Sequence, residues 1–170
     1  LTVSGERMAD KAAAEQLKEA CQGVNVTIKK VECKEKSEKP PALYDLTTLQ
    51  RDANRLLGFT AQQTLDYLQS LYEKKLCTYP RTDSRYLTGD MADSLPVLVK
   101  LVANAMPFRK GIAITCDPQT VINDKKVTDH HAVIPTRNLK DADLSALPAG
   151  EKAVLELVAL RLLCAVAHPH

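Results

Sequence analysis

Apolar residues recur every three or four positions in five stretches of the chain. This spacing predicts helices over residues 8–22, 47–58, 60–75, 88–106 and 151–167, with Pro96 kinking or restarting the fourth. The last helix is expected to be buried through Val154, Leu155, Val158, Leu162, Leu163 and Val166.

The second and third helices are separated by a glycine turn. Thr47 or Thr48 is placed to cap the first of the pair, Gly58 to end it, and Thr60 to cap the second. Residues 47–75 therefore predict a helix-turn-helix-like unit, which we interpret as scaffold in preference to a helix that enters a nucleic-acid groove. Its second helix is expected to bury a stripe of Leu65, Leu68, Leu71 and Tyr72.

Short strands are predicted between the helices. Apolar and polar residues alternate over residues 24–33, with a bulge at Lys29 and Lys30, and brief apolar runs occur at 112–116 and 132–134. The expected fold class is α+β, mainly α, with a few short strands. A densely charged stretch that runs into Pro40 and Pro41 predicts a boundary between domains over residues 1–39 and 40–168.

Composition narrows the class of protein. The 170 residues are 45% apolar and 26% charged, as in ordinary soluble globular proteins, and the net charge is only +2. Any attraction to nucleic acid must therefore come from local clusters of Lys and Arg.

The five cysteines are scattered, which argues against a disulfide framework or a zinc site and favours a cytoplasmic protein with reduced thiols. No apolar run reaches the length of a membrane span, and the ends suggest a segment excised from a longer protein.

Candidate chemistry lies in the stretch from Leu76 to Tyr86. Pro80 pushes Tyr79 toward an extended backbone, so the side chains of Tyr79 and Arg81 are expected on the same side. A phenol beside a guanidinium is a plausible phosphate-attacking pair, because the cation favours phenolate and binds phosphate oxygens. The alternative is a half-buried aromatic ring beside a solvated arginine.

A second cluster lies at residues 128–136, where His130 and His131 are adjacent. On an extended segment their side chains point to opposite sides, so they do not readily share one metal ion. One of them could face a site while the other is solvated or bonded to a carboxylate such as Asp129. A structural histidine pair is the alternative.

Taken in order, the motifs resemble one known family. They are Leu43-Tyr44-Asp45-Leu46-Thr47-Thr48-Leu49-Gln50, Ala53-Asn54, Leu57-Gly58-Phe59-Thr60, Thr78-Tyr79-Pro80-Arg81-Thr82-Asp83-Ser84 and Asp129-His130-His131-Ala132-Val133-Ile134-Pro135-Thr136. In order and spacing the chain resembles type IA DNA topoisomerases, in particular the bacterial topoisomerase III branch. Residues 40–168 would be the active-site tyrosine domain, and residues 1–39 part of the adjoining arch domain.

The resemblance implies a role for each motif residue. Tyr79 would attack one phosphodiester of single-stranded DNA and form a 5′-phosphotyrosine, with Arg81 orienting the scissile phosphate. His130 would hydrogen-bond the phosphate or a nearby carboxylate, whereas His131 matches a less constrained position. Further DNA-binding or loop-supporting positions would be Gln50, Arg51, Asn54, Thr82, Asp83, Arg85 and His131.

The family also implies parts that this chain does not contain. A Toprim domain with a cluster of acidic residues would bind Mg²⁺, and no Asp-x-Asp-x-Glu or Asp-x-Asp-x-Asp run occurs here. We therefore expect no metal bound by this fragment and no relaxation of supercoiled DNA by the fragment alone. The full-length protein would be a cytoplasmic, nucleoid-associated monomer that relaxes or decatenates DNA without ATP.

Three other classes of protein are alternatives. A tyrosine nickase would need two histidines separated by one residue to bind a metal, whereas these are adjacent. A tyrosine recombinase would place its Arg and His groups before the tyrosine, the reverse of the order here. A non-catalytic single-stranded DNA-binding module would use Tyr79 only to stack on a base.

Overall fold

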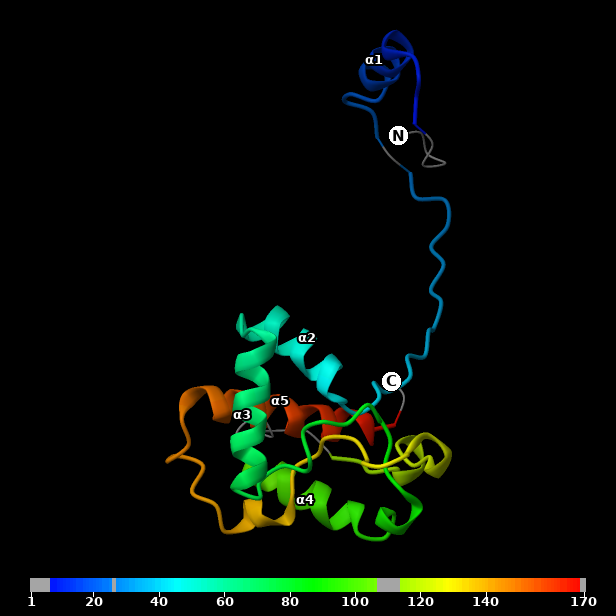
Figure 1. Cartoon of the computed structure of the whole chain (residues 1–170). Helices are drawn as coiled ribbons and strands as arrows, with labels where there is room; N and C mark the ends of the chain where they lie inside the picture. The colour runs from blue at the N-terminus through cyan, green and yellow to red at the C-terminus, as the bar shows by residue number, and fades with distance from the viewer. Residues whose placement is uncertain (1–6, 26, 107–113, 169–170) are drawn as a thin grey trace. The chain divides into compact units, whose positions relative to one another are not determined.

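A computed structural model describes residues 7–25, 27–106 and 114–168 of the chain (Figure 1). The chain divides into two units, Leu1–Lys36 and Ser37–His170, which are described separately. In the first unit, helix α1 (Lys11–Ala20) begins after Asp10, whose carboxylate accepts a hydrogen bond of 2.9 Å from the N–H of Ala12.

The predicted strand over residues 24–33 is wrong. The described residues of this stretch form no β pairing, and the side chains of Ile28 and Val31 are 77% and 81% exposed. A strand needs a neighbouring strand to bind its backbone N–H and C=O groups, and the described part of this unit provides none. Val26 lies outside the described residues.

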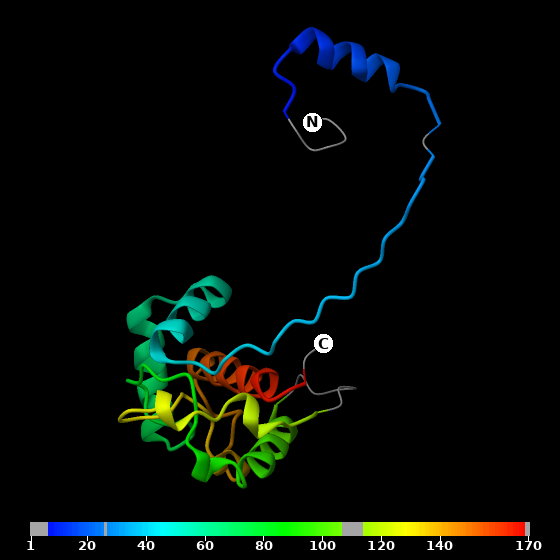
Figure 2. The ribbon, with the colours of Figure 1, turned by 90° about the vertical axis from the view of Figure 1, so that its right-hand side faces the viewer.

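The second unit is mainly helical, which confirms the predicted fold class. Helices α2 (Leu46–Leu57), α3 (Ala61–Glu73) and α4 (Leu95–Ala105) all pack against α5 (Ala149–Ala165), as Figures 1 and 2 show. The shorter elements are one-turn helices η1 (Gly89–Met91), η3 (Pro118–Thr120), η4 (Asp124–Lys126) and η5 (Arg137–Lys140). None of the described helices is long and apolar enough to span a bilayer.

The expected short strands are reduced to single bridges. Within the described ranges, Tyr44 pairs with Val133 and Cys77 with Pro135 in antiparallel fashion, and Leu87 pairs with Ile122 in parallel. The run at 132–134 is buried as predicted. The predicted strand at 112–116 lies partly outside the described residues, and its described part forms no strand.

Helices α2 and α3 form the predicted helix-turn-helix-like unit, with one difference at the first cap. Asp45, and not Thr47 or Thr48, caps α2: its carboxylate accepts the N–H of Thr48 at 2.6 Å, and the Thr48 hydroxyl accepts the N–H of Asp45 at 3.2 Å. A carboxylate followed three residues later by a hydroxyl can bond reciprocally, which a lone threonine cannot. Thr60 caps α3 as predicted.

The core surrounds α5. Its residues Val154, Leu155, Val158, Leu162, Leu163 and Val166 are all buried, as predicted. In α3, Leu68 and Leu71 are fully buried, but Tyr72 remains 39% exposed, contrary to prediction. Pro96 lies in the first turn of α4, so the helix restarts there after η1.

Helix α3 ends in a strained position that leads directly into the Tyr79 stretch. The N–H of Leu76 bonds the carbonyl of Leu71 and the N–H of Lys75 bonds that of Tyr72, both at 2.8 Å. This closing motif needs a left-handed residue, and Lys75 supplies it with a φ of +58°. The carbonyl of Lys75 then accepts hydrogen bonds from the side chains of Thr136 and Asn138.

A polar network fixes α2 against α5. Arg161 donates hydrogen bonds to the Tyr44 hydroxyl at 3.0 Å and to the Asp52 carboxylate, and its guanidinium lies 4.1 Å from the centre of the Tyr44 ring. The Tyr44 hydroxyl donates to Asp52 at 2.8 Å. Burial and this hydrogen bond to Asp52 raise the pKa of Tyr44 to about 12, because both favour the protonated phenol.

Replacing Lys75 with glycine is expected to stabilise the fold. Glycine adopts a left-handed backbone without steric cost, so Lys75→Gly should raise the free energy of unfolding in urea by about 1 kcal/mol. The matched control is Gly58→Ala: Gly58 has a φ of +73° and open space around its Cβ position, so only backbone strain changes. The control should lower stability by a similar amount. If Lys75→Gly and the parent chain have the same free energy of unfolding, the left-handed backbone at Lys75 is not strained.

The Tyr44 network predicts an alkaline transition. A folded pKa of about 12, above the ordinary 10.0, means that its contribution to stability is complete below pH 10 and lost as pH rises toward 12. Titration of phenolate absorbance should show a late step that disappears in Tyr44→Phe and moves to the ordinary value in urea-unfolded protein. If Tyr44→Phe leaves the alkaline end of the folded protein's titration curve unchanged, the raised pKa of Tyr44 is contradicted.

Candidate active site

Two segments far apart in the sequence are hydrogen-bonded side by side, and together they build the site. The N–H of Thr78 donates to the carbonyl of Ile134 at 3.0 Å, and the N–H of Thr136 donates to that of Leu76 at 2.9 Å. The Thr78 hydroxyl accepts the N–H of Ile134 at 3.0 Å and donates to the carbonyl of Ala132 at 3.2 Å. This pairing fixes the backbone on the N-terminal side of Tyr79.

The pairing places Tyr79 and His130 in ring contact. Their ring centroids are 4.3 Å apart with planes tilted by 38°. The ring of Tyr72 also meets that of Tyr79 edge to face, with centroids 5.5 Å apart and an interplanar angle of 82°. The Tyr79 ring is half-buried, and its hydroxyl has no hydrogen-bond partner within the described part of the chain.

His131 does not join His130 in the site. Its Nδ1 lies 2.8 Å from the carbonyl oxygen of Ala132, a contact within the segment itself. The two adjacent histidines thus have different surroundings, as predicted, although the backbone at residues 128–130 bends.

Arg81 lines an open cleft of about 510 Å³. Its guanidinium is exposed and has no hydrogen-bond or ion-pair partner among residues 7–25, 27–106 and 114–168. Tyr79 is not among the residues that line the cleft. They are Asp45, Leu46, Thr47, Leu65, Arg81, Thr82, Asp83, Thr128 and Asp129.

The cleft carries more negative than positive charge. Asp45, Asp83 and Asp129 contribute three carboxylates, against the one guanidinium of Arg81. These carboxylates repel an anionic phosphate. Among the described residues that line this cleft, only Arg81 attracts the DNA backbone.

Thr82 and Arg85 support the loop from within. The buried hydroxyl of Thr82 donates to the carbonyl of His130 at 2.9 Å and accepts the N–H of Ser84 at 3.1 Å. The carbonyl of Thr82 accepts the N–H of Leu46 at 3.1 Å. Arg85 Nε donates to the carbonyl of Leu43 at 3.2 Å. Both side chains therefore join the loop to its neighbours.

The residues predicted to contact DNA from α2 lie near the turn into α3. The side-chain amide of Gln50 donates to the carbonyl of Ala61 at 3.0 Å, and that of Asn54 donates to the carbonyl of Phe59 at 3.0 Å. Arg51 is exposed. Sequence reasoning missed that these two amides close the turn; their roles on DNA stay predictions.

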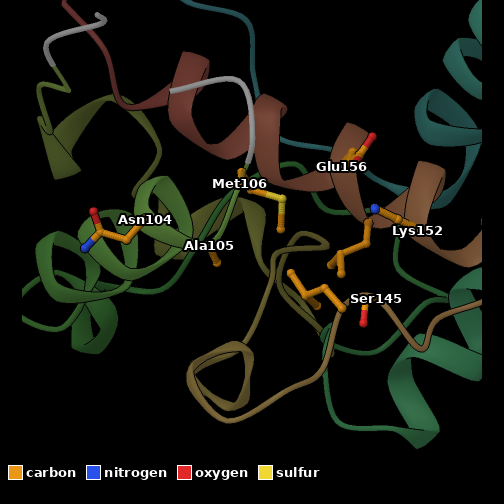
Figure 3. A pocket seen from close by; sticks show the side chains of 8 residues that line it. Asn104, Ala105, Met106, Ser145, Lys152 and Glu156 are labelled. Carbon is orange, nitrogen blue, oxygen red and sulfur yellow. The ribbon is translucent and has the colours of Figure 1, made fainter. Parts of the chain in front are cut away.

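Other features of the surface offer no further chemistry of this kind. Among the described residues, no three His, Cys, Asp or Glu side chains converge to bind a metal ion. A separate pocket of about 290 Å³ lies between the end of α4, the loop at Leu144 and Ser145 that precedes α5, and α5 itself (Figure 3). It is lined by none of the predicted site residues.

Comparison with known proteins identifies relatives. A family model described as DNA topoisomerase matches residues 2–170. The chain is 42% identical over 165 residues to DNA topoisomerase 3 of Shouchella clausii (strain KSM-K16), covering 93% of this chain and 22% of the relative. It is 39% identical over 174 residues to DNA topoisomerase 3 of Bacillus licheniformis, covering 98% and 23%. The chain thus spans less than a quarter of the length of these relatives.

A solved structure shows the same fold. Full-length topoisomerase I from Thermotoga maritima is similar with a TM-score of 0.65 and 24% identity, over 92% of this chain and 25% of that one.

Removing the Thr82 hydroxyl is expected to loosen the His130 segment. Thr82→Val leaves the carbonyl of His130 and the N–H of Ser84 without their partner, which should lower the free energy of unfolding by about 1–3 kcal/mol. Thr82→Ser keeps the hydroxyl and serves as the control. Equal urea denaturation midpoints for the two variants would show that the hydroxyl does not stabilise the loop.

Proposed function

This chain belongs to the type IA DNA topoisomerase family, and from that premise we propose that the full-length protein cleaves and rejoins one DNA strand through Tyr79. The observation that carries the proposal is the ring contact between Tyr79 and His130, at 4.3 Å, between two segments joined by backbone hydrogen bonds. It brings the phenol of one motif to the imidazole of the other.

The reaction conserves the number of phosphodiester bonds. The Tyr79 oxygen forms a bond to phosphorus, the bond from phosphorus to the 3′ oxygen breaks, and the phenol proton is lost while the 3′ oxygen gains one. The product is a 5′-phosphotyrosine and a free 3′ hydroxyl, and the reverse reaction restores the strand without ATP. A phenol with no hydrogen-bond partner in the described structure is free to make this attack.

Arg81 and His130 would assist at the phosphate. The unpaired guanidinium of Arg81 can bind the phosphate oxygens and favour the charge that develops on them. His130 can donate a hydrogen bond to the phosphate or to a nearby carboxylate. Tyr79, Arg81 and His130 are thus the catalytic residues that we propose, with Asp83, Arg51 and the surrounding loop as candidates for further DNA contacts.

The rest of the site is proposed to lie outside this chain. The three carboxylates of the Arg81 cleft oppose phosphate binding, and the described residues contain no side-chain cluster fit for a metal ion. We place the Mg²⁺ expected of the family in a Toprim domain of the full-length protein and assign it no step here. The proposed partners are single-stranded or underwound DNA and the remaining domains of the same polypeptide.

A covalent adduct tests the nucleophile. Full-length protein mixed with single-stranded DNA and Mg²⁺, then denatured, should retain DNA covalently at its new 5′ end. Tyr79→Phe should abolish the adduct, whereas Tyr67→Phe, which removes the hydroxyl from a ring that packs on Phe59, should retain it. An adduct at the 3′ end would favour a recombinase, and tight DNA binding with no adduct would favour a non-catalytic binding module.

The isolated chain is expected to be inactive in relaxation. Residues 1–170 alone should leave supercoiled plasmid unchanged in Mg²⁺ over a time in which the full-length enzyme relaxes it completely, because we place the metal-binding part of the site in another domain. Robust relaxation by the isolated chain, lost in Tyr79→Phe, would contradict the proposal that the site is shared with another domain.

A further inference from the structure

Among the described residues, Tyr72 is the aromatic neighbour of Tyr79 that the proposed chemistry does not use. It lies at the next-to-last position of α3 (Ala61–Glu73), and 39% of it is exposed, where a core residue at this spacing would be buried. Its ring meets the ring of Tyr79 edge to face, with centroids 5.5 Å apart and planes at 82°. This is the favoured geometry of an aromatic pair, in which a positive ring edge meets a negative ring face.

Two ring contacts among the described residues bear on the orientation of the Tyr79 ring. Its hydroxyl has no hydrogen-bond partner in the described parts of the chain, so no polar bond fixes where the phenol points. The Thr78 bonds fix the backbone but leave rotation about the Cα–Cβ bond of Tyr79 free. His130 contacts the ring at 4.3 Å, and Tyr72 supplies the second ring contact.

Tyr72 is also held firmly enough to act as a reference. Its backbone lies within α3, and its carbonyl accepts the N–H of Lys75 at 2.8 Å in the motif that ends the helix. Leu71, the preceding residue, is fully buried. The Tyr72 backbone is therefore fixed to the helical core, whereas Tyr79 lies on a segment outside the helices.

We propose that Tyr72 is a positioning residue: its ring, acting with His130, holds the Tyr79 phenol in the orientation required to attack the phosphate. This inference rests on the proposed function, because it concerns the same nucleophile. It assigns the effect to the aromatic ring of Tyr72 and none to its hydroxyl.

The test measures the rate of covalent adduct formation by the full-length enzyme in a single turnover at saturating single-stranded DNA. The Kd for the same DNA is measured separately by fluorescence anisotropy. Tyr72→Ala and Tyr72→Leu remove the ring, the second keeping much of the volume should the first fail to fold. Tyr72→Phe keeps the ring. Gln62→Ala, an exposed change in the first turns of the same helix, is the control.

Loss of the ring should slow adduct formation by roughly 2- to 10-fold, the range expected for one aromatic pair, with Kd unchanged. Tyr72→Phe and Gln62→Ala should match the wild type. Equal losses in Tyr72→Phe and Tyr72→Ala would assign the effect to the hydroxyl, and a changed Kd with an unchanged rate would make Tyr72 a DNA contact. Either result, or no effect, overturns the inference.

The same experiment separates this inference from the proposed function. If the wild-type enzyme forms no adduct at Tyr79, the proposed function fails. If it does form the adduct and all Tyr72 variants match it, only the positioning role fails.

Discussion

The site depends on the hydrogen-bonded pairing of residues 76–78 with residues 132–136. Thr78 contributes both its N–H and its hydroxyl to this pairing, bonding the backbone of Ala132 and Ile134. Without it, Tyr79 would leave α3 on an unsupported extended segment, and His130 would lie on a separate loop. The pairing is short, a single antiparallel bridge at Cys77 and Pro135, so it needs the buried side chains on either side to remain in register.

The helices supply that support. The lead-in to α2 bonds both halves of the site: the N–H of Leu46 donates to Thr82, and the carbonyl of Tyr44 accepts the N–H of Val133. Arg161 in α5 then fixes Tyr44 through its hydroxyl and its ring. The fold thus holds the backbone at Tyr79, our proposed nucleophile, and exposes the Arg81 guanidinium at an open, mostly acidic cleft. An acidic cleft attracts DNA weakly by itself, which fits our proposal that another domain completes the site.

Much of the fold could be predicted from the sequence, because the positions of helices follow from local residue patterns. Apolar spacing predicted helices α2, α3 and α5, which the structure confirms. The motifs at 78–84 and 129–136 singled out Tyr79, Arg81 and His130; the structure brings the rings of Tyr79 and His130 together, and the roles of all three stay predictions. The strand at 24–33 was wrong because alternation reports a local preference and not the presence of a partner strand. The cap of α2 was assigned to threonine because the reciprocal bond between Asp45 and Thr48 was overlooked. The contacts of Thr78 and Tyr72 with the site join segments by tertiary structure, and no local spacing predicts them.

The central claim is that the hydroxyl of Tyr79 becomes the covalent attachment point for DNA. The most direct measurement is mass spectrometry of the denatured adduct of the full-length protein after nuclease and trypsin digestion. Cleavage after Lys75 and Arg81 should release the peptide Leu76–Arg81 with a nucleotide linked through its 5′ phosphate to the oxygen of Tyr79. A nucleotide attached to Tyr72 or Tyr86, or linked through a 3′ phosphate, would contradict the account.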